Sequence, residues 1–169
     1  QLALIGKYSL EELAQLRQWG SPTTGHPEFE VARGVENTSG PLGQGHTFAV
    51  GAAIAAKFLA AHTGNPTFAK ETIYAYISDG GIQEEISQGA ARIAAVLGLD
   101  NLIMFYDSND IQLSTETGEV MNEDTAAKYR ALGWEVLEIN GNDAAEIRKA
   151  IEAAKAVTGK PTLIIGKCI

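Results

Sequence analysis

The stretch that decides the fold runs from Thr72 to Asp110 and reads TIYAYISDGGIQEEISQGAARIAAVLGLDNLIMFYDSND. Its apolar runs TIYAYI and NLIMFYD are rich in aromatic and β-branched residues and predict two strands. The segment IQEEISQGAARIAAVLG between them predicts a helix that ends at Gly98. A strand, a helix and a strand in this order predict a β-α-β crossover, which places two parallel strands side by side.

The rest of the chain continues this alternation. The buried helix HTFAVGAAIAAKFLAAHTG is expected to precede the stretch and to end at Gly64. After it we expect helix, strand, helix and strand over 122–133, 134–139, 143–157 and 161–167, with Asn122 capping the first of these helices. Strands that are apolar on both faces imply a parallel sheet covered on both sides. We therefore predict an α/β protein with a three-layer α/β/α fold and a mainly parallel sheet, forming a single domain over residues 1–169.

The N-terminal part of the chain has a different character. Ser9 and Glu12 have the spacing of a capping box, which predicts a short helix over SLEELAQLRQW. Residues 20–45 then carry six glycines and three prolines with almost no periodicity, which predicts a long loop. Loops of this length inside a compact domain usually have a function.

Composition limits the classes of partner. A net charge of −8 argues against nucleic acid or an anionic membrane surface as the main partner. Cys168 is the single cysteine, so a disulfide framework is excluded, and a reducing cytoplasm is the expected location. We also expect no signal peptide and no transmembrane segment. The chain begins and ends abruptly, which suggests a fragment of something larger.

Two polar side chains follow the strands of the first stretch. Asp79 ends one strand and Asn109 follows the next, one crossover later. Because the carboxyl ends of parallel strands share one edge of the sheet, the two side chains are expected to converge there. A carboxylate, an amide oxygen and a backbone carbonyl suit Mg²⁺ or Ca²⁺. The alternative is that Asp79 only caps a helix and Asn109 only makes a turn.

Glycines provide two further candidates. Gly80 and Gly81 open the predicted helix, where free N–H groups and bare backbone favour a phosphate. The loop TSGPLGQGH places Leu42 between glycines, either as a plug into the core or as part of a cradle for a ring system. His46 is expected to cap the buried helix or to face a ligand, and His62 to be structural.

Several motifs together resemble a known family. The sequence SDGG…EE, followed about thirty residues later by SND, resembles the signature of thiamine diphosphate enzymes. The segments TTGHPEFE, GVENTSGPLGQG, YISDGGIQEEISQ, FYDSNDIQLS and EDTAAKYRALGWEV are similar to the N-terminal, pyrophosphate-binding domain of transketolase. The likeness runs in order from about Leu10 to Lys167, nearly the whole chain.

The resemblance implies roles for individual residues. Asp79 and Asn109 would ligate a divalent cation, Mg²⁺ or Ca²⁺, together with the backbone carbonyl of Ile111. Glu84 would have a catalytic role in the network that links the two active sites of the family's dimer, where it acts through other groups and does not ligate the ion. The positions implied to contact thiamine diphosphate are Gly40, Pro41, Leu42, Gly80 and Asn109.

The resemblance also implies an activity. Transketolase moves a two-carbon ketol unit between sugar phosphates in the pentose phosphate pathway, in the cytoplasm, as a homodimer. The family's substrate-binding histidines do not align with any histidine here, and its pyrimidine-binding domain is missing. The chain is therefore expected to need a pyrimidine-binding domain or subunit for catalysis. The alternative is a non-catalytic cofactor-binding or assembly module.

Three positions depart from the family pattern, and other enzyme classes remain as rivals. Ser78 and Glu85 stand where glycine is usual, and so does Asp110. Deoxyxylulose-phosphate synthase or a dehydrogenase subunit is the rival within thiamine diphosphate enzymes. A phosphotransferase that uses Asp79 as nucleophile is disfavoured, because Gly81 stands where a second acid is needed.

Overall fold

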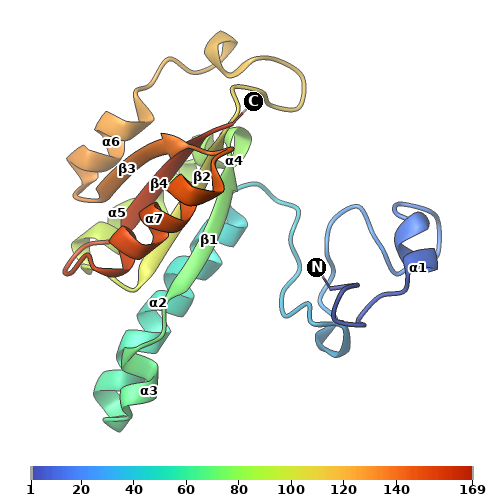
Figure 1. The fold of residues 1–169 in the computed structure, drawn as a ribbon, viewed down its shortest axis with the longest axis horizontal. Helices are drawn as coiled ribbons and strands as arrows, with labels where there is room; N and C mark the ends of the chain where they lie inside the picture. Colours follow the sequence, from blue (N-terminus) through green and yellow to red (C-terminus); the bar gives the residue numbers. More distant parts are fainter. Residues whose placement is uncertain (1, 169) are drawn as a thin grey trace. The chain divides into compact units, whose positions relative to one another are not determined.

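Two parallel strands form the frame of the structure, a computed structural model that describes residues 2–168. β1 (Ile73–Ser78) pairs with β2 (Leu102–Ser108) in a register that sets Ser78 opposite Asp107. The crossover predicted from Thr72 to Asp110 is thereby confirmed. Both strands end at the same edge of the sheet, which is the upper edge in Figure 1.

Four strands make up the sheet of the described residues, in the order β1-β2-β4-β3, and every pairing is parallel. β3 (Glu135–Asn140) lies at one edge, and β4 (Thr162–Lys167) lies beside β2 in the interior. Five of the six residues of β4 are buried, as expected of an apolar run in a central strand. The prediction of a parallel sheet is therefore confirmed.

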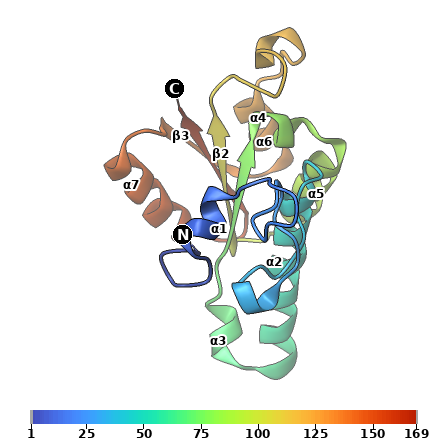
Figure 2. The same ribbon diagram turned by 90° about the vertical axis from the view of Figure 1, so that its right-hand side faces the viewer.

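Helices cover both faces of the sheet, as Figures 1 and 2 show. On the first face lie α2 (Gln44–Thr63), α5 (Glu85–Val96) and α6 (Thr125–Leu132), packed on a core that includes Leu102, Met104 and Leu163. On the second face, α7 (Ala144–Lys155) packs Ala150 and Ala154 against Ile103 and Ile164. The predicted α/β/α layers are present.

The second face also carries an apolar groove beside α7. The groove has a volume of about 370 Å³, and Tyr76 at its rim is 70% exposed and stacks on Phe105 with 5.3 Å between ring centroids. Tyr74 and Ile151 line it as well. We call these residues, Tyr74, Tyr76, Phe105 and Ile151, the aromatic groove.

The helix predicted over 82–98 differs from the observed structure. The chain forms α4 (Asp79–Gln83), adopts an extended conformation at Glu84, and then forms α5. Side chains of α5 explain the break: the Ser87 hydroxyl donates to the Gly81 carbonyl at 2.8 Å, and the Gln88 amide donates to the Ile82 carbonyl. These bonds satisfy carbonyls that a continuous helix would have used.

Other helix ends follow the expected signals, with one correction. Gly64 ends α2 and Gly133 ends α6 in the left-handed conformation, as predicted. The cap of α6 is Asp124, whose carboxylate accepts from the Ala127 N–H at 2.9 Å, and not Asn122. A short helix that was not predicted, α3 (Pro66–Ala69), connects α2 to β1.

The chain divides into two compact units, Gln1–Pro41 and Leu42–Ile169, and the sheet belongs to the second. In the first unit, α1 (Leu10–Ala14) has the predicted capping box between Ser9 and Glu12. α1 is shorter than expected, and the remainder of this unit consists mostly of loop and turns, with a 3₁₀ turn at Val31–Arg33. That a single domain spans residues 1–169 remains a prediction. No helix within residues 2–168 is long and apolar enough to cross a membrane.

His46 neither caps α2 nor reaches solvent. It is 3% exposed, its ring meets Trp134 edge-on at 6.2 Å, and neither ring nitrogen has a hydrogen-bond partner. Burial lowers the pKa of His46 from its ordinary 6.5 to about 4, because the cationic form would lose its hydration.

This burial predicts a loss of stability in acid. Between pH 6.5 and about 4 the unfolded chain takes up a proton at His46 and the folded chain does not. The contribution of the neutral, buried His46 to the free energy of unfolding is complete above pH 6.5 and falls as the pH drops through this window. The total loss is about 3 kcal/mol, since one pKa unit corresponds to about 1.4 kcal/mol. Urea unfolding across this pH range should therefore show a shallower pH dependence for His46→Leu than for the parent chain. His62→Gln, on an exposed histidine, is the matched control, and an unchanged slope in His46→Leu would contradict the prediction.

Gly43 permits the close approach of α2 to α5. Its φ is +80°, and a Cβ placed there would lie 2.7 Å from both Ile86 Cγ2 and Ser87 Oγ. The Ser87 hydroxyl is already bonded to the Gly81 carbonyl, so it cannot move aside without cost.

We predict that Gly43→Ala lowers the free energy of unfolding by about 2–4 kcal/mol, combining left-handed strain with overpacking. Thermal or urea unfolding measures this loss. Gly45→Ala is the matched control, because a Cβ at Gly45 meets nothing within 4 Å. Equal effects of the two substitutions would contradict the close approach.

Candidate functional site

A buried carboxylate lies at the C-terminal edge of the sheet. Asp79 is 1% exposed, although it directly follows β1. Its Oδ1 accepts a hydrogen bond from the Tyr106 hydroxyl at 2.5 Å, and its Oδ2 accepts one from the backbone N–H of Asn109 at 3.0 Å. The structure therefore brings the Asp79 carboxylate to the backbone of Asn109, and convergence of the two side chains on one ion remains a prediction.

Asp79 is not the cap of a helix, so the part of the alternative that made it a cap is wrong. The cap of α4 is Ser78, whose hydroxyl accepts from the Gly81 N–H at 3.4 Å. This bond also occupies one of the N–H groups that were expected to face a phosphate. Because α4 is only five residues long, its dipole is small, and an anion here would depend more on a cation than on the helix.

The turn after β2 presents oxygen atoms at the same edge. The Asn109 side-chain oxygen accepts from the Ile111 N–H at 3.1 Å, so the predicted turn exists and fixes the amide. Asp110 within the turn has a φ of +62°, a conformation that aspartate tolerates better than most residues. The amide oxygen and each carboxylate oxygen of Asp79 retain a lone pair for a further partner.

Tyr106 contacts Asp79 at this site, and the sequence reasoning did not find it. Its ring is buried in the first-face core, and its hydroxyl ends at Asp79. Burial is the main cause that raises the pKa of Tyr106, and the hydrogen bond to Asp79 and its charge add to it. The hydroxyl therefore stays protonated and acts as a donor. The signal was present in the strand NLIMFYD, because a buried tyrosine hydroxyl usually has a polar partner.

Leu42 lies next to this site. Its Cδ1 is 3.4 Å from the position a Cβ would take on Gly80, and its side chain is 54% exposed. Leu42 is therefore not a plug into the core, and it meets bare backbone beside Asp79. Gly40 and Pro41 belong to the first unit, so their predicted contact with a cofactor remains a prediction.

The two adjacent glutamates occupy different environments. Glu84 is half-buried at the junction of α4 and α5, and its Cβ is 3.0 Å from the Cβ position of Gly43. Glu85 is exposed in the first turn of α5, where a negative charge favours the helix dipole. The helix dipole is therefore a structural reason for a glutamate at position 85, and this reason does not require a ligand.

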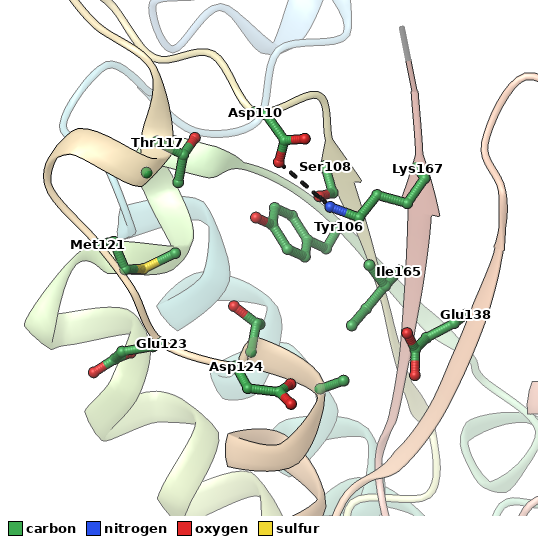
Figure 3. Close-up of a pocket in the computed structure, with 13 residues that line it drawn as sticks. Tyr106, Ser108, Asp110, Thr117, Met121, Glu123, Asp124, Glu138, Ile165 and Lys167 are labelled. Atoms are coloured by element: carbon green, nitrogen blue, oxygen red, sulfur yellow. Dashed lines mark hydrogen bonds and ion pairs between the residues drawn. The ribbon is translucent and has the colours of Figure 1, made fainter.

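A hollow of about 290 Å³ opens beside the site, and Figure 3 shows the residues around it. Tyr106 and Ser108 line it from β2, and Lys167 reaches it from β4. The Lys167 ammonium donates to the Ser108 hydroxyl at 2.8 Å and pairs with Asp110 at 3.3 Å, the dashed line in Figure 3. With Asp79 nearby, carboxylates outnumber the ammonium at this edge, which favours a cation.

These residues fit a hard divalent cation. The donors are a carboxylate, an amide oxygen and the peptide carbonyls of the turn, which is an all-oxygen set. Within residues 2–168 there is no group of three or more His, Cys, Asp or Glu side chains suited to a metal.

Comparison with known proteins places the chain in a family. The family model "Transketolase, thiamine diphosphate binding domain" matches residues 1–169. A transketolase of Streptococcus pyogenes is 48% identical over 164 residues, which is 95% of this chain and 22% of that protein. A transketolase of Staphylococcus epidermidis is 46% identical over 99% of this chain and 26% of its own length.

Solved structures give the same result. Transketolase from Leishmania mexicana superposes with a TM-score of 0.89 at 41% identity, over 99% of this chain and 26% of that chain. The transketolase from Campylobacter jejuni gives 0.82 at 43% identity, over 94% and 25%. This chain thus spans about a quarter of the length of the relatives that it matches. It belongs to the transketolase family, and its residues correspond to the thiamine diphosphate-binding domain of that family.

Proposed function

We propose that this chain binds thiamine diphosphate together with Mg²⁺, or Ca²⁺ in its place. Asp79 and Asn109 would hold the ion with the backbone carbonyl of Ile111, while Gly40, Pro41, Leu42 and Gly80 would contact the cofactor. One observation carries the proposal: a buried carboxylate and an asparagine turn meet at the C-terminal edge of a parallel sheet. Ligands of such sheets bind at this edge.

The ion has a specific task in this proposal. A chain of net charge −8 repels a diphosphate, and α4 has few N–H groups and a small dipole to offset that repulsion. Asp79 would hold a divalent cation, and the charge supplied by that ion would offset the repulsion between the diphosphate and the chain. This role would not require the ion to activate water.

The proposed activity is the transfer of a two-carbon ketol unit between sugar phosphates. Thiamine diphosphate, when bound, supplies the carbanion chemistry. The residues of this chain position it: Asp79 and Asn109 fix the ion, and Leu42 and Gly80 present a surface without polar side chains. Glu84, half-buried beside Gly43, would act through other groups to link two active sites.

Assembly is part of the proposal. We propose that the chain forms a homodimer or pairs with a pyrimidine-binding domain or subunit, in the cytoplasm, as a component of the pentose phosphate pathway. Exposed apolar side chains on two helices support an interface, because monomers rarely leave such surfaces open. They are Phe48, Ile54 and Phe58 on α2, and Ile86, Ile93 and Val96 on α5.

Cofactor binding tests the site directly. We expect isothermal titration of thiamine diphosphate to show binding that requires Mg²⁺ in the parent chain. Asp79→Asn and Asn109→Ala should each weaken it by at least about tenfold, which equals about 1.4 kcal/mol, because the first removes the negative charge of a proposed ion ligand and the second removes a ligand oxygen. Asp79→Asn keeps the size of the buried side chain, and thermal unfolding verifies that the variant folds.

Matched controls lie at the opposite edge of the sheet. Asp100 and Asn101 directly precede β2, where Asp100 pairs with Lys57 and Asn101 donates to the Ala53 carbonyl. Asp100→Asn and Asn101→Ala make the same chemical changes far from the proposed site. They should leave cofactor affinity within about twofold of the parent, a difference of about 0.4 kcal/mol in binding free energy. Unchanged affinity in Asp79→Asn would remove the basis of the site assignment.

Catalysis tests the second half of the proposal. Because this chain spans about a quarter of its relatives' length, ketol transfer should appear only when a pyrimidine-binding domain from a relative is added. The assay follows transfer between sugar phosphates, and sedimentation of the same mixtures reports the assembly. Ketol transfer by the chain alone would show that no partner domain is needed. Cofactor binding without transfer in every mixture would support a non-catalytic module.

A further inference from the structure

The Asp79 carboxylate is held at both oxygens from two separate points of the structure. Tyr106 donates to Oδ1 from within β2, and the Asn109 N–H donates to Oδ2 from the turn beyond it. The terminal torsion of an aspartate is otherwise soft and takes a broad range of values. Two donors on different oxygens remove that freedom, so the carboxylate presents one fixed plane.

Of the two groups that donate to the Asp79 carboxylate, the Tyr106 hydroxyl is the one held by a rigid core side chain. Its ring is 4% exposed and packs in the first-face core, and Figure 3 shows it between the strands and the hollow. The backbone of Asp79 is held as well, since the Gln83 side chain donates to the Asp79 carbonyl at 3.0 Å. The rotation of the carboxylate is thus the freedom that remains, and the Tyr106 hydroxyl restricts it together with the Asn109 N–H.

Mg²⁺ and Ca²⁺ respond differently to such control. Mg²⁺ requires near-ideal octahedral geometry at short distances, whereas Ca²⁺ accepts six to eight ligands and either monodentate or bidentate carboxylates. A carboxylate held in one orientation suits the octahedral geometry that Mg²⁺ requires. A carboxylate free to rotate costs Mg²⁺ affinity and leaves Ca²⁺ affinity nearly unchanged.

We propose that Tyr106 is a positioning residue that locks the Asp79 carboxylate in one orientation and thereby makes this site prefer Mg²⁺ over Ca²⁺. The inference rests on the proposed ion site and adds to it a residue that determines which ion is taken. Tyr106 acts through Asp79 and does not itself contact the ion.

The chain offers a matched control for the test. Tyr129 is fully buried in the same core, but its hydroxyl has no hydrogen-bond partner. Tyr106→Phe and Tyr129→Phe therefore remove the same atom from two buried rings, and only the first loses a contact with Asp79. A general effect of removing a buried hydroxyl would appear in both variants.

The first measurement uses the 169-residue chain without metal or cofactor. Hydrogen exchange at the Asn109 amide reports how firmly Asp79 Oδ2 is held, because that N–H is bonded to it. Exchange should accelerate by about tenfold or more in Tyr106→Phe, as for a loss of about 1.4 kcal/mol in local stability, and stay at the parent rate in Tyr129→Phe. An unchanged rate in Tyr106→Phe would overturn the locked orientation.

The second measurement is thiamine diphosphate affinity with Mg²⁺ and with Ca²⁺. In Tyr106→Phe, the Mg²⁺-supported affinity should fall by about tenfold and the Ca²⁺-supported affinity by less than about threefold. Tyr129→Phe should keep both values. Equal losses with the two ions would overturn the metal preference and leave Tyr106 as a stabilising residue only.

The two measurements separate this inference from the proposed function. If the parent chain bound no cofactor with either ion, the proposed function and the metal preference would both be overturned. The exchange rate at Asn109 would still decide whether Tyr106 orients Asp79, since it needs neither ion nor cofactor.

Discussion

The burial of the Asp79 carboxylate is the constraint on which the functional edge of this structure depends. Removing a carboxylate from water costs several kcal/mol unless hydrogen bonds replace its hydration. Here the replacements are the Tyr106 hydroxyl and the Asn109 N–H, both on or just beyond β2. The β1–β2 register must be kept for both bonds to form, so one charged group ties together a strand pair, a core tyrosine and a turn.

Near this carboxylate, a small number of contacts connects the helices α2, α4 and α5. Ser87 in the first turn of α5 bonds to Gly81 in α4, and it also faces Gly43, which precedes α2. The start of α2 is therefore positioned by the break between α4 and α5. Because Gly81 is two residues from Asp79, two contacts connect Gly43 to the chain segment that carries the carboxylate. Gly43 is needed because a side chain there would push against α5, and Gly81 because a side chain there would meet Ile77 of β1.

Sequence reasoning predicted most of the elements and the approach of Asp79 to Asn109, because a β-α-β crossover normally places consecutive strands side by side. It did not find Tyr106, since the partner of a strand residue depends on register, which the pattern of apolar residues does not specify here. It also predicted one helix where Glu84 separates two, because the caps from Ser87 and Gln88 are contacts that form only after the chain folds. Asn122 and Asp124 are both good caps by type, and residue type alone does not distinguish them; α6 begins after the second.

The aromatic groove on the second face has a consequence for the behaviour of the chain in solution. Stacked rings that remain exposed attract one another between molecules, while the net charge of −8 keeps the molecules apart. Salt shortens the range of that repulsion to about 8 Å at physiological ionic strength and leaves apolar attraction intact. We therefore expect contact between the grooves of neighbouring molecules to be favoured more in moderate salt than in dilute buffer.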